Sequence, residues 1–154
     1  MGDGFSGRDS ELMQLALDEA QKAAEHGDVP IGAVLASEGA VLASSGNERE
    51  LRGDPTAHAE IIVLREAAAS LGGWRLPATT LYVTLEPCAM SAGAVVLARV
   101  PRVVFATADP KAGAAGSVFD ILGEPRLNHR PKVESGLLAD EAAAQLRAFF
   151  AARR

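Results

Sequence analysis

The chain has 154 residues, a length that suits one compact domain and leaves no room for a second independent core. With 48% hydrophobic and 23% charged residues it has the composition of an ordinary globular domain, which excludes disordered, collagen-like and coiled-coil chains. The net charge of -5 excludes a broadly basic nucleic-acid-binding surface, so any polyanion must meet a local patch.

No segment has the pattern of a membrane span or a secretion signal. Residues 1–30 carry acidic residues where a signal peptide would be basic and then apolar, and residues 83–98 are too short to cross a bilayer. The single cysteine, Cys88, excludes an internal disulfide and agrees with a reducing compartment. We expect a cytoplasmic protein without membrane contact, folded as one domain over residues 1–154, with residues 1–8 as a disordered extension.

The first third of the chain is predicted to form a helix, the two strands of a hairpin and a polar loop. Asp9 and Ser10 are candidates for the N-cap of the helix, and Gly27 ends it. In chain order the elements are residues 9–26, 31–36, 41–43 and 44–54.

Strands and helices alternate over the rest of the chain. Pro55 opens a second helix that ends at Gly72 and Gly73, and Pro87 opens a third. Further elements are a strand at 80–84, the third helix to residue 98, a strand at 102–106, a glycine-rich loop at 109–117, a short helix near Phe119, a strand at 132–135 and a helix at 140–152. This alternation predicts an α/β layered fold in which a hairpin precedes the βαβ units.

Two of the predicted helix starts carry side chains that can bind a metal. His58 and Glu60 stand at the second helix and Cys88 at the third. Helix starts that follow strand ends gather at one edge of an α/β sheet, so the imidazole and the thiol can face one point. Both donors suit zinc, and the positive end of a helix favours the thiolate. Glu60 lies on another side of the helix and suits a proton carrier beside the metal.

Each of these residues, taken alone, is weak evidence for a functional site. A histidine at a helix start is most often a solvated cap, a lone cysteine is most often a small buried hydrophobe, and Asn47 in a polar loop is by default a turn residue. Their joint spacing is the specific signal.

The spacing H-x-E followed by P-C-x-x resembles the zinc deaminases, in which a second cysteine completes the motif. Over nearly the whole chain the sequence is similar to the bacterial tRNA-specific adenosine deaminases of the cytidine deaminase-like superfamily. The matching runs are residues 29–34, Asn47, 55–60, 80–88, 92–94, 111–117 and 128–130. The resemblance implies a three-layer α/β fold with a mixed central sheet of about five strands, flanked by helices.

The resemblance also implies a reaction and a substrate. In that family a zinc-activated water attacks C6 of an extruded adenine, a glutamate carries the protons, and adenosine becomes inosine. Here Glu60 would be the catalytic residue, with His58, Cys88 and the third motif position, Ser91, at the Zn²⁺ ion. The substrate would be the wobble adenosine in the anticodon stem-loop of an arginine tRNA; no DNA is expected.

Further substrate contacts are carried over position by position. Asn47 would bond the base, Val29 and Ile31 would line the base slot, and the backbone N–H groups of Ala59 and Cys88 would face the site. Asp109 would contact the ribose region. The residues expected at flanking nucleotides and phosphates are Asn128, His129, Arg130, Arg147, Arg153 and Arg154.

Ser91 departs from the family pattern, which has cysteine at this position. A serine hydroxyl is a hard, weak and neutral ligand, whereas a thiolate brings charge and softness. We therefore expect low zinc occupancy and weak deamination from this chain.

Two alternatives stay open. The same fold could deaminate a free base or nucleoside such as guanine or cytosine, or the chain could be a non-catalytic RNA-binding subunit with a decayed zinc site. An apolar helix face and the family resemblance also imply a homodimer in which each subunit helps to close the other's pocket.

Overall fold

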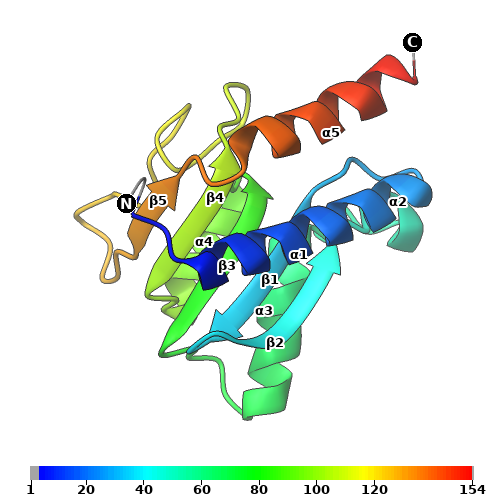
Figure 1. Ribbon diagram of the computed structural model, residues 1–154. Coiled ribbons are helices and arrows are strands. Elements are labelled where there is room, and N and C mark those ends of the chain that lie inside the picture. The colour runs from blue at the N-terminus through cyan, green and yellow to red at the C-terminus, as the bar shows by residue number, and fades with distance from the viewer. Residues whose placement is uncertain (1–3, 154) are drawn as a thin grey trace.

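A computed structural model describes residues 4–153 (Figure 1). Five strands form one mixed sheet in the order β2-β1-β3-β4-β5. The elements are α1 (Gly7–Glu25), β1 (Gly32–Ser37), β2 (Ala40–Gly46), α2 (Arg49–Arg52), α3 (Ala59–Leu71), β3 (Thr79–Leu85), α4 (Ala89–Ala98), β4 (Arg102–Thr107), β5 (Lys132–Ser135) and α5 (Ala139–Ala151). The predicted α/β fold with a mixed sheet of five strands is confirmed.

Strand direction decides which chain ends meet at each edge of the sheet. β1 is antiparallel to both β2 and β3, whereas β3, β4 and β5 are parallel to one another. The start of β1 therefore lies beside the carboxyl ends of β3 and β4. The loop that enters β1 and the loops that leave β3 and β4 lie at this edge of the sheet, together with the starts of α3 and α4.

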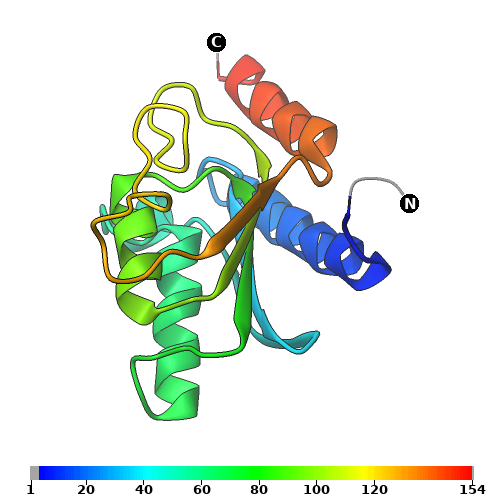
Figure 2. The same cartoon turned by 90° about the vertical axis from the view of Figure 1, so that its left-hand side faces the viewer.

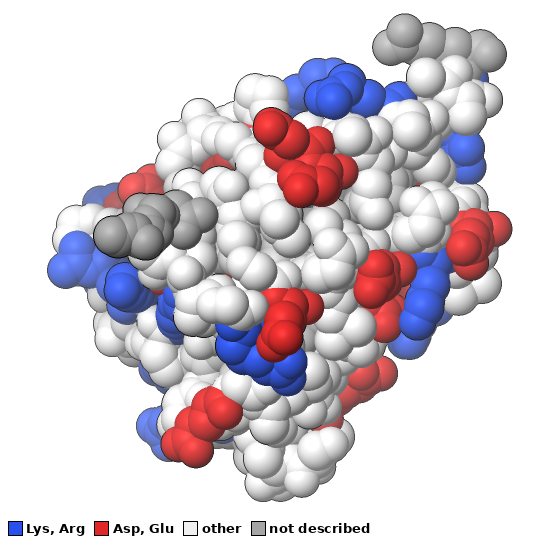
Figure 3. Space-filling model, viewed as in Figure 1, with Lys and Arg blue, Asp and Glu red and all other residues white. Residues whose placement is uncertain are grey.

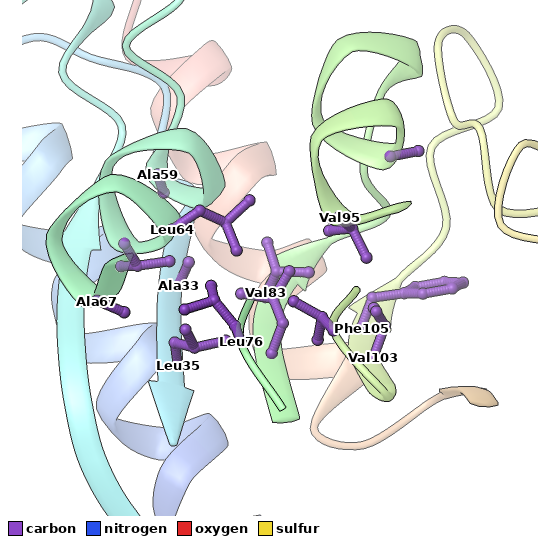
Figure 4. Packing of buried hydrophobic residues seen from close by; sticks show 14 of the residues in the cluster. Ala33, Leu35, Ala59, Leu64, Ala67, Leu76, Val83, Val95, Val103 and Phe105 are labelled. Atoms are coloured by element: carbon purple, nitrogen blue, oxygen red, sulfur yellow. The ribbon is translucent and has the colours of Figure 1, made fainter. Parts of the chain in front are cut away.

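Helices cover both faces of the sheet. α1 and α5 pack on one face and α3 and α4 on the other, as the two ribbon views show (Figures 1 and 2). Because both faces are buried, the central strands are continuously apolar: Ala33 and Leu35 point toward α3 and α4, while Val34 and Ala36 point toward α1. Figure 4 shows the larger core, in which Leu64 and Ala67 of α3 and Val95 of α4 meet the sheet.

The first helix begins earlier than the sequence indicated. Ser6 is the N-cap, and its side chain and that of Asp9 form a reciprocal capping box, so the prediction of Asp9 or Ser10 as the cap was wrong. Residues 6–8, expected in a disordered extension, belong to this helix start; residues 1–3 lie outside the described part. α1 packs so closely on the sheet that a Cβ on Gly32 would lie 1.8 Å from the carbonyl oxygen of Ala16.

Three local predictions differ from the structure. The polar loop contains the short helix α2, and α3 starts at Ala59 because Asp54 accepts hydrogen bonds from Thr56 and holds the preceding residues in a turn. The expected helix near Phe119 is wrong: the segment forms turns and an isolated bridge between Ala115 and Asp120.

The face seen in Figure 3 carries no strongly charged patch. Acidic and basic side chains are interspersed there with much uncharged surface, without a broad field of one sign. Within residues 4–153, no helix is both long and apolar enough to span a bilayer.

Candidate active site

A cavity of about 600 Å³ opens at the edge of the sheet where β1 starts and β3 and β4 end. The starts of α2 and α3 form one wall, the loop after β4 a second, and the C-terminal half of α5 a third. The lining residues are Val29, Ile31, Asn47, Arg49, His58, Ala59, Glu60, Leu85, Ala108, Asp109, Pro110, Lys111, Leu146, Arg147 and Phe150.

His58 and Cys88 occupy equivalent places, each at the N-cap of its helix with extended backbone. The Nδ1 atom of His58 lies 3.6 Å from the Sγ atom of Cys88, and the Oγ atom of Ser91 lies 3.8 Å from that sulfur. The side chains of His58 and Ser91 thus converge on the sulfur atom of Cys88.

This neighbourhood changes the proton affinity of each group. Burial raises the pKa of the Cys88 thiol, but hydrogen bonds with His58 and Ser91 outweigh it and bring the pKa to about 7. The bond to Cys88 in turn raises the pKa of His58. Glu60 is buried beside them, and burial raises the pKa of its carboxyl group despite a hydrogen bond with Ser91.

Asn47 is held at the cavity wall by local hydrogen bonds. Its Nδ2 donates to the carbonyl oxygen of Val29 at 3.3 Å, and its Oδ1 accepts the backbone N–H of Arg49 at 3.1 Å. Its backbone N–H donates to Ile31 at 2.8 Å. The side chain is therefore held against the segment that precedes β1, to which the backbone of Asn47 is also bonded.

Comparison with known proteins shows the family to which this chain belongs. A sequence profile of the MafB19-like deaminases matches residues 8–154. The chain belongs to the MafB19-like deaminase family. It is 51% identical over 143 residues to the tRNA-specific adenosine deaminase of Bacillus subtilis (strain 168), covering 93% of this chain and 89% of the relative.

A second relative and a solved structure support the same assignment. The tRNA-specific adenosine deaminase of Agrobacterium fabrum is 48% identical over 145 residues, which cover 94% of this chain and 95% of the relative. A structure solved in a study of A-to-I editing by tRNA:A34 deaminases at the wobble position of transfer RNA has a TM-score of 0.86 and 48% identity, covering 89% of this chain and 99% of that chain. The predicted resemblance is confirmed.

Zinc dependence is typical of the deaminase family. In this chain the spacing of the His58 and Cys88 donor atoms suits a zinc ion, but the chemistry of the full donor set does not. Zinc bonds of about 2.3 Å to sulfur and about 2.0 Å to nitrogen at a tetrahedral angle place the two donors about 3.5 Å apart, close to the separation found here. A catalytic zinc takes three good protein ligands, however, and Ser91 offers only a neutral hydroxyl. Over residues 4–153 no cluster contains three His, Cys, Asp or Glu side chains placed to hold a metal.

Not every residue expected at the deaminase site lies at the cavity. Val29, Ile31, Asn47, Ala59 and Asp109 line it, whereas Asn128, His129 and Arg130 do not. His129 contacts the carbonyl oxygen of Val100 at 2.7 Å, just before β4 starts, which is the opposite edge of the sheet. Their contact with RNA stays a prediction for nucleotides outside the cavity.

The C-terminal arginines also differ in their position relative to the cavity. Arg147 lines the cavity, whereas the guanidinium of Arg153 lies 3.7 Å from the ring centroid of Phe149 and bonds the carbonyl oxygen of Gly27. Arg154 lies outside the described residues.

Sequence reasoning missed Arg49 and Phe150 at the cavity and the buried carboxylate of Glu86 behind it. Arg49 and Phe150 carry no local signal, because only the packing of α2 and α5 brings them to the cavity. Glu86 did offer one: it is the single charged residue in the stretch 83–98.

Proposed function

We propose that this chain deaminates the wobble adenosine in the anticodon loop of an arginine tRNA to inosine. The observation that carries the proposal is the placement of the buried Glu60 carboxyl group in one cavity with His58 and Asn47, beside Cys88. The curated relatives named as tRNA-specific adenosine deaminases support the same reaction.

Each residue has a definite part in that reaction. The adenine enters between Val29 and Ile31, and the Asn47 amide bonds its edge. Hydrolysis adds water at C6 and expels the amino group as ammonia, so protons must leave the water and reach the base. Glu60 accepts one proton from the water and passes it to a ring nitrogen. It then takes the second proton from the hydroxyl group now bound to C6 and gives it to the amino group, which leaves as ammonia while the C6 oxygen becomes a carbonyl.

The mouth of the cavity suits a single-stranded polyanion. Arg49, Lys111 and Arg147 come from three separate elements and line the same opening, beside the exposed ring of Phe150. Cations that meet phosphates and an aromatic ring that stacks on a base are the usual means of binding an unpaired strand. This supplies the local basic patch that the net charge of the chain does not reveal.

We infer that Ser91 limits the reaction, because the site lacks the third strong ligand for zinc. Changing a residue that merely orients a metal ligand typically costs about 10- to 100-fold in metal affinity or activity, and losing the ligand should cost more. Ser91→Cys should therefore raise both the zinc content, measured by elemental analysis, and the rate of inosine formation on an anticodon stem-loop. Stoichiometric zinc with undiminished turnover in the unmodified chain would contradict this inference.

A second function is favoured by Ser91 itself: a non-catalytic subunit that binds the anticodon loop. The same experiment separates the two, with guanine and cytosine as additional substrates. Inosine from the stem-loop after Ser91→Cys supports the tRNA deaminase, and product from a free base alone supports a base deaminase. Stem-loop binding without any product supports the binding subunit.

We also propose a homodimer formed through the α3/α4 face. This face has two hollows of about 520 and 600 Å³, which are lined by the exposed apolar residues Trp74, Leu97, Phe119 and Leu127. Apolar patches of this kind usually mark an interface.

We further propose a cytoplasmic location, which fits a tRNA substrate and a lone thiol at the site.

A further inference from the structure

Glu86 has no part in the chemistry described so far, although it is a buried carboxylate next to the site. It lies where β3 ends and the chain turns toward α4, two residues before Cys88, and the residue is only 2% exposed. It is not among the residues that line the cavity. A carboxylate is costly to bury unless hydrogen bonds replace its hydration, so its partners indicate its role.

Within residues 4–153, the side chain of Glu86 accepts hydrogen bonds from one segment, the loop of residues 109–117. Its Oε1 accepts the backbone N–H of Asp109 at 3.0 Å and the hydroxyl of Ser117. Its Oε2 accepts the N–H of Ala115 at 2.9 Å and that of Ser117 at 3.1 Å. One carboxylate thus bonds both ends of a loop that follows β4.

A further contact attaches this loop to the turn that carries Cys88: the N–H of Ala114 donates to the carbonyl oxygen of Pro87 at 2.7 Å. The N–H of Glu86 donates to the carbonyl oxygen of Thr107, the last residue of β4, at 2.9 Å. The loop also passes very close to the carboxylate: a Cβ on Gly113 would lie 2.3–2.5 Å from its carboxyl atoms. Only glycine leaves room for all four hydrogen bonds.

The loop in turn supplies the second wall of the cavity. Asp109 and Lys111 line the opening, and Asp109 Oδ1 accepts the N–H groups of Lys111 and Ala112 at 3.0 and 3.3 Å. Glu86 therefore fixes the backbone of Asp109, and Asp109 fixes the turn that presents Lys111.

We propose that Glu86 is a positioning residue for the RNA, whose carboxylate holds the 109–117 loop at a fixed height above the Cys88 turn. The proposal rests on the RNA substrate argued above. It assigns Glu86 an effect on substrate binding through Asp109 and Lys111, without contact between Glu86 and the substrate.

Glu86→Gln tests the proposal because it keeps the shape and removes one acceptor. The amide oxygen can satisfy two of the four donors, and the amide NH₂ must face the other two. The Ser117 hydroxyl can rotate to accept from that NH₂, but a backbone N–H cannot. The favoured orientation leaves the N–H of Asp109 opposite another donor, so the amide of Asp109 should be released first.

Hydrogen exchange on the unmodified chain and its variants measures this release directly. We expect exchange at Asp109 to rise at least about tenfold in Glu86→Gln and less in Ser117→Ala, which loses only the hydroxyl. The matched control is Glu25→Gln, the same change at an exposed site on α1, which should leave the loop unchanged. Unchanged exchange at Asp109 in Glu86→Gln overturns the proposal whatever the substrate is.

The consequence for substrate is measured in a Ser91→Cys background on an anticodon stem-loop. Glu86→Gln should raise KM about tenfold and leave kcat and zinc content nearly unchanged, because the loop binds RNA and the metal ligands are elsewhere. Gly113→Ala, which displaces the carboxylate from the other side with Glu86 intact, should raise KM in the same way. A fall in kcat or zinc content at constant KM would show that Glu86 supports Cys88, and would overturn the proposal. Failure of the Ser91→Cys chain to bind the stem-loop refutes the proposed function, while the exchange result still decides whether Glu86 holds the loop.

Discussion

Glu60 is the residue on which the proposed reaction depends most directly. Glu60→Gln in the Ser91→Cys background keeps the volume of the side chain and removes its ability to carry a proton. Since general acid–base catalysis contributes about 10²–10⁴-fold, we expect inosine formation to fall by that factor. Stem-loop affinity and zinc content, measured on the same sample, should stay unchanged; turnover within a few-fold of the parent would exclude Glu60 as the proton carrier.

Single residues differ in how far the sequence reveals their roles. His58, Glu60 and Cys88 could be placed in advance because each stands at a helix start, and a local pattern of caps and prolines indicates such starts. Glu86 could not be placed, because the loop donors that surround it lie 23 to 31 residues further along the chain. A buried acid in an apolar stretch signals that partners exist without indicating where they are.

Among the elements, the strands and long helices follow from local hydrophobic patterns, but the short segments depend on tertiary partners. α2 has four residues and its N-cap residue Glu48 makes no side-chain cap, so nothing in its own sequence marks it. The cap is supplied by Asp28, whose buried carboxylate accepts the N–H groups of Glu50 at 2.6 Å and Leu51 at 3.1 Å. The C-terminal half of α5 is likewise predictable as helix, whereas its place over the cavity is not.

Asp28→Asn should release α2 because one of two accepting oxygens becomes a donor. We expect a loss of about 1–3 kcal/mol in the free energy of unfolding, measured with urea, and faster amide exchange at Glu50 and Leu51. Stem-loop affinity should fall as well, since Arg49 begins this helix and lines the cavity. Asp18→Asn, the same change at an exposed site on α1, is the matched control. Equal exchange at α2 in both variants would contradict this role for Asp28.

At the scale of the whole molecule, an ion-pair network joins four elements across the sheet. Asp9 of α1 bonds Arg102 of β4 at 2.9 and 3.0 Å and the Tyr82 hydroxyl of β3 at 2.5 Å, and Arg102 also bonds Glu134 of β5. The hydrogen bonds from Arg102 hold the pKa of Asp9 well below its usual range, although burial opposes them. Burial and Asp9 together raise the pKa of Tyr82 to about 12.

The network predicts a defined dependence of stability on pH. Because the folded-state pKa of Asp9 is lowered, its contribution is fully present above the unfolded-state pKa of about 3.9 and is lost as pH falls toward the folded value. Asp9→Asn should cost about 3 kcal/mol in the free energy of unfolding near pH 7, and the difference from the parent should shrink below about pH 4. Urea unfolding at several pH values measures it; a difference that stays constant down to pH 2 would show that Asp9 acts through packing alone.

Leu97 tests how two copies of the chain assemble. It is 69% exposed and belongs to both hollows of the α3/α4 face, so it lies near the centre of the proposed interface. In a two-fold dimer each substitution occurs twice, and losing the burial of a leucine costs about 2 kcal/mol per copy, so Leu97→Asp should weaken dimerisation by about 10³-fold. Sedimentation velocity should then show a monomer where the parent is a dimer, and Leu51→Asp, an equal change at a 57% exposed leucine on α2, should leave the dimer intact. A Leu97→Asp variant that sediments like the parent would place the interface on another face, and a parent that stays monomeric at every concentration would refute the dimer.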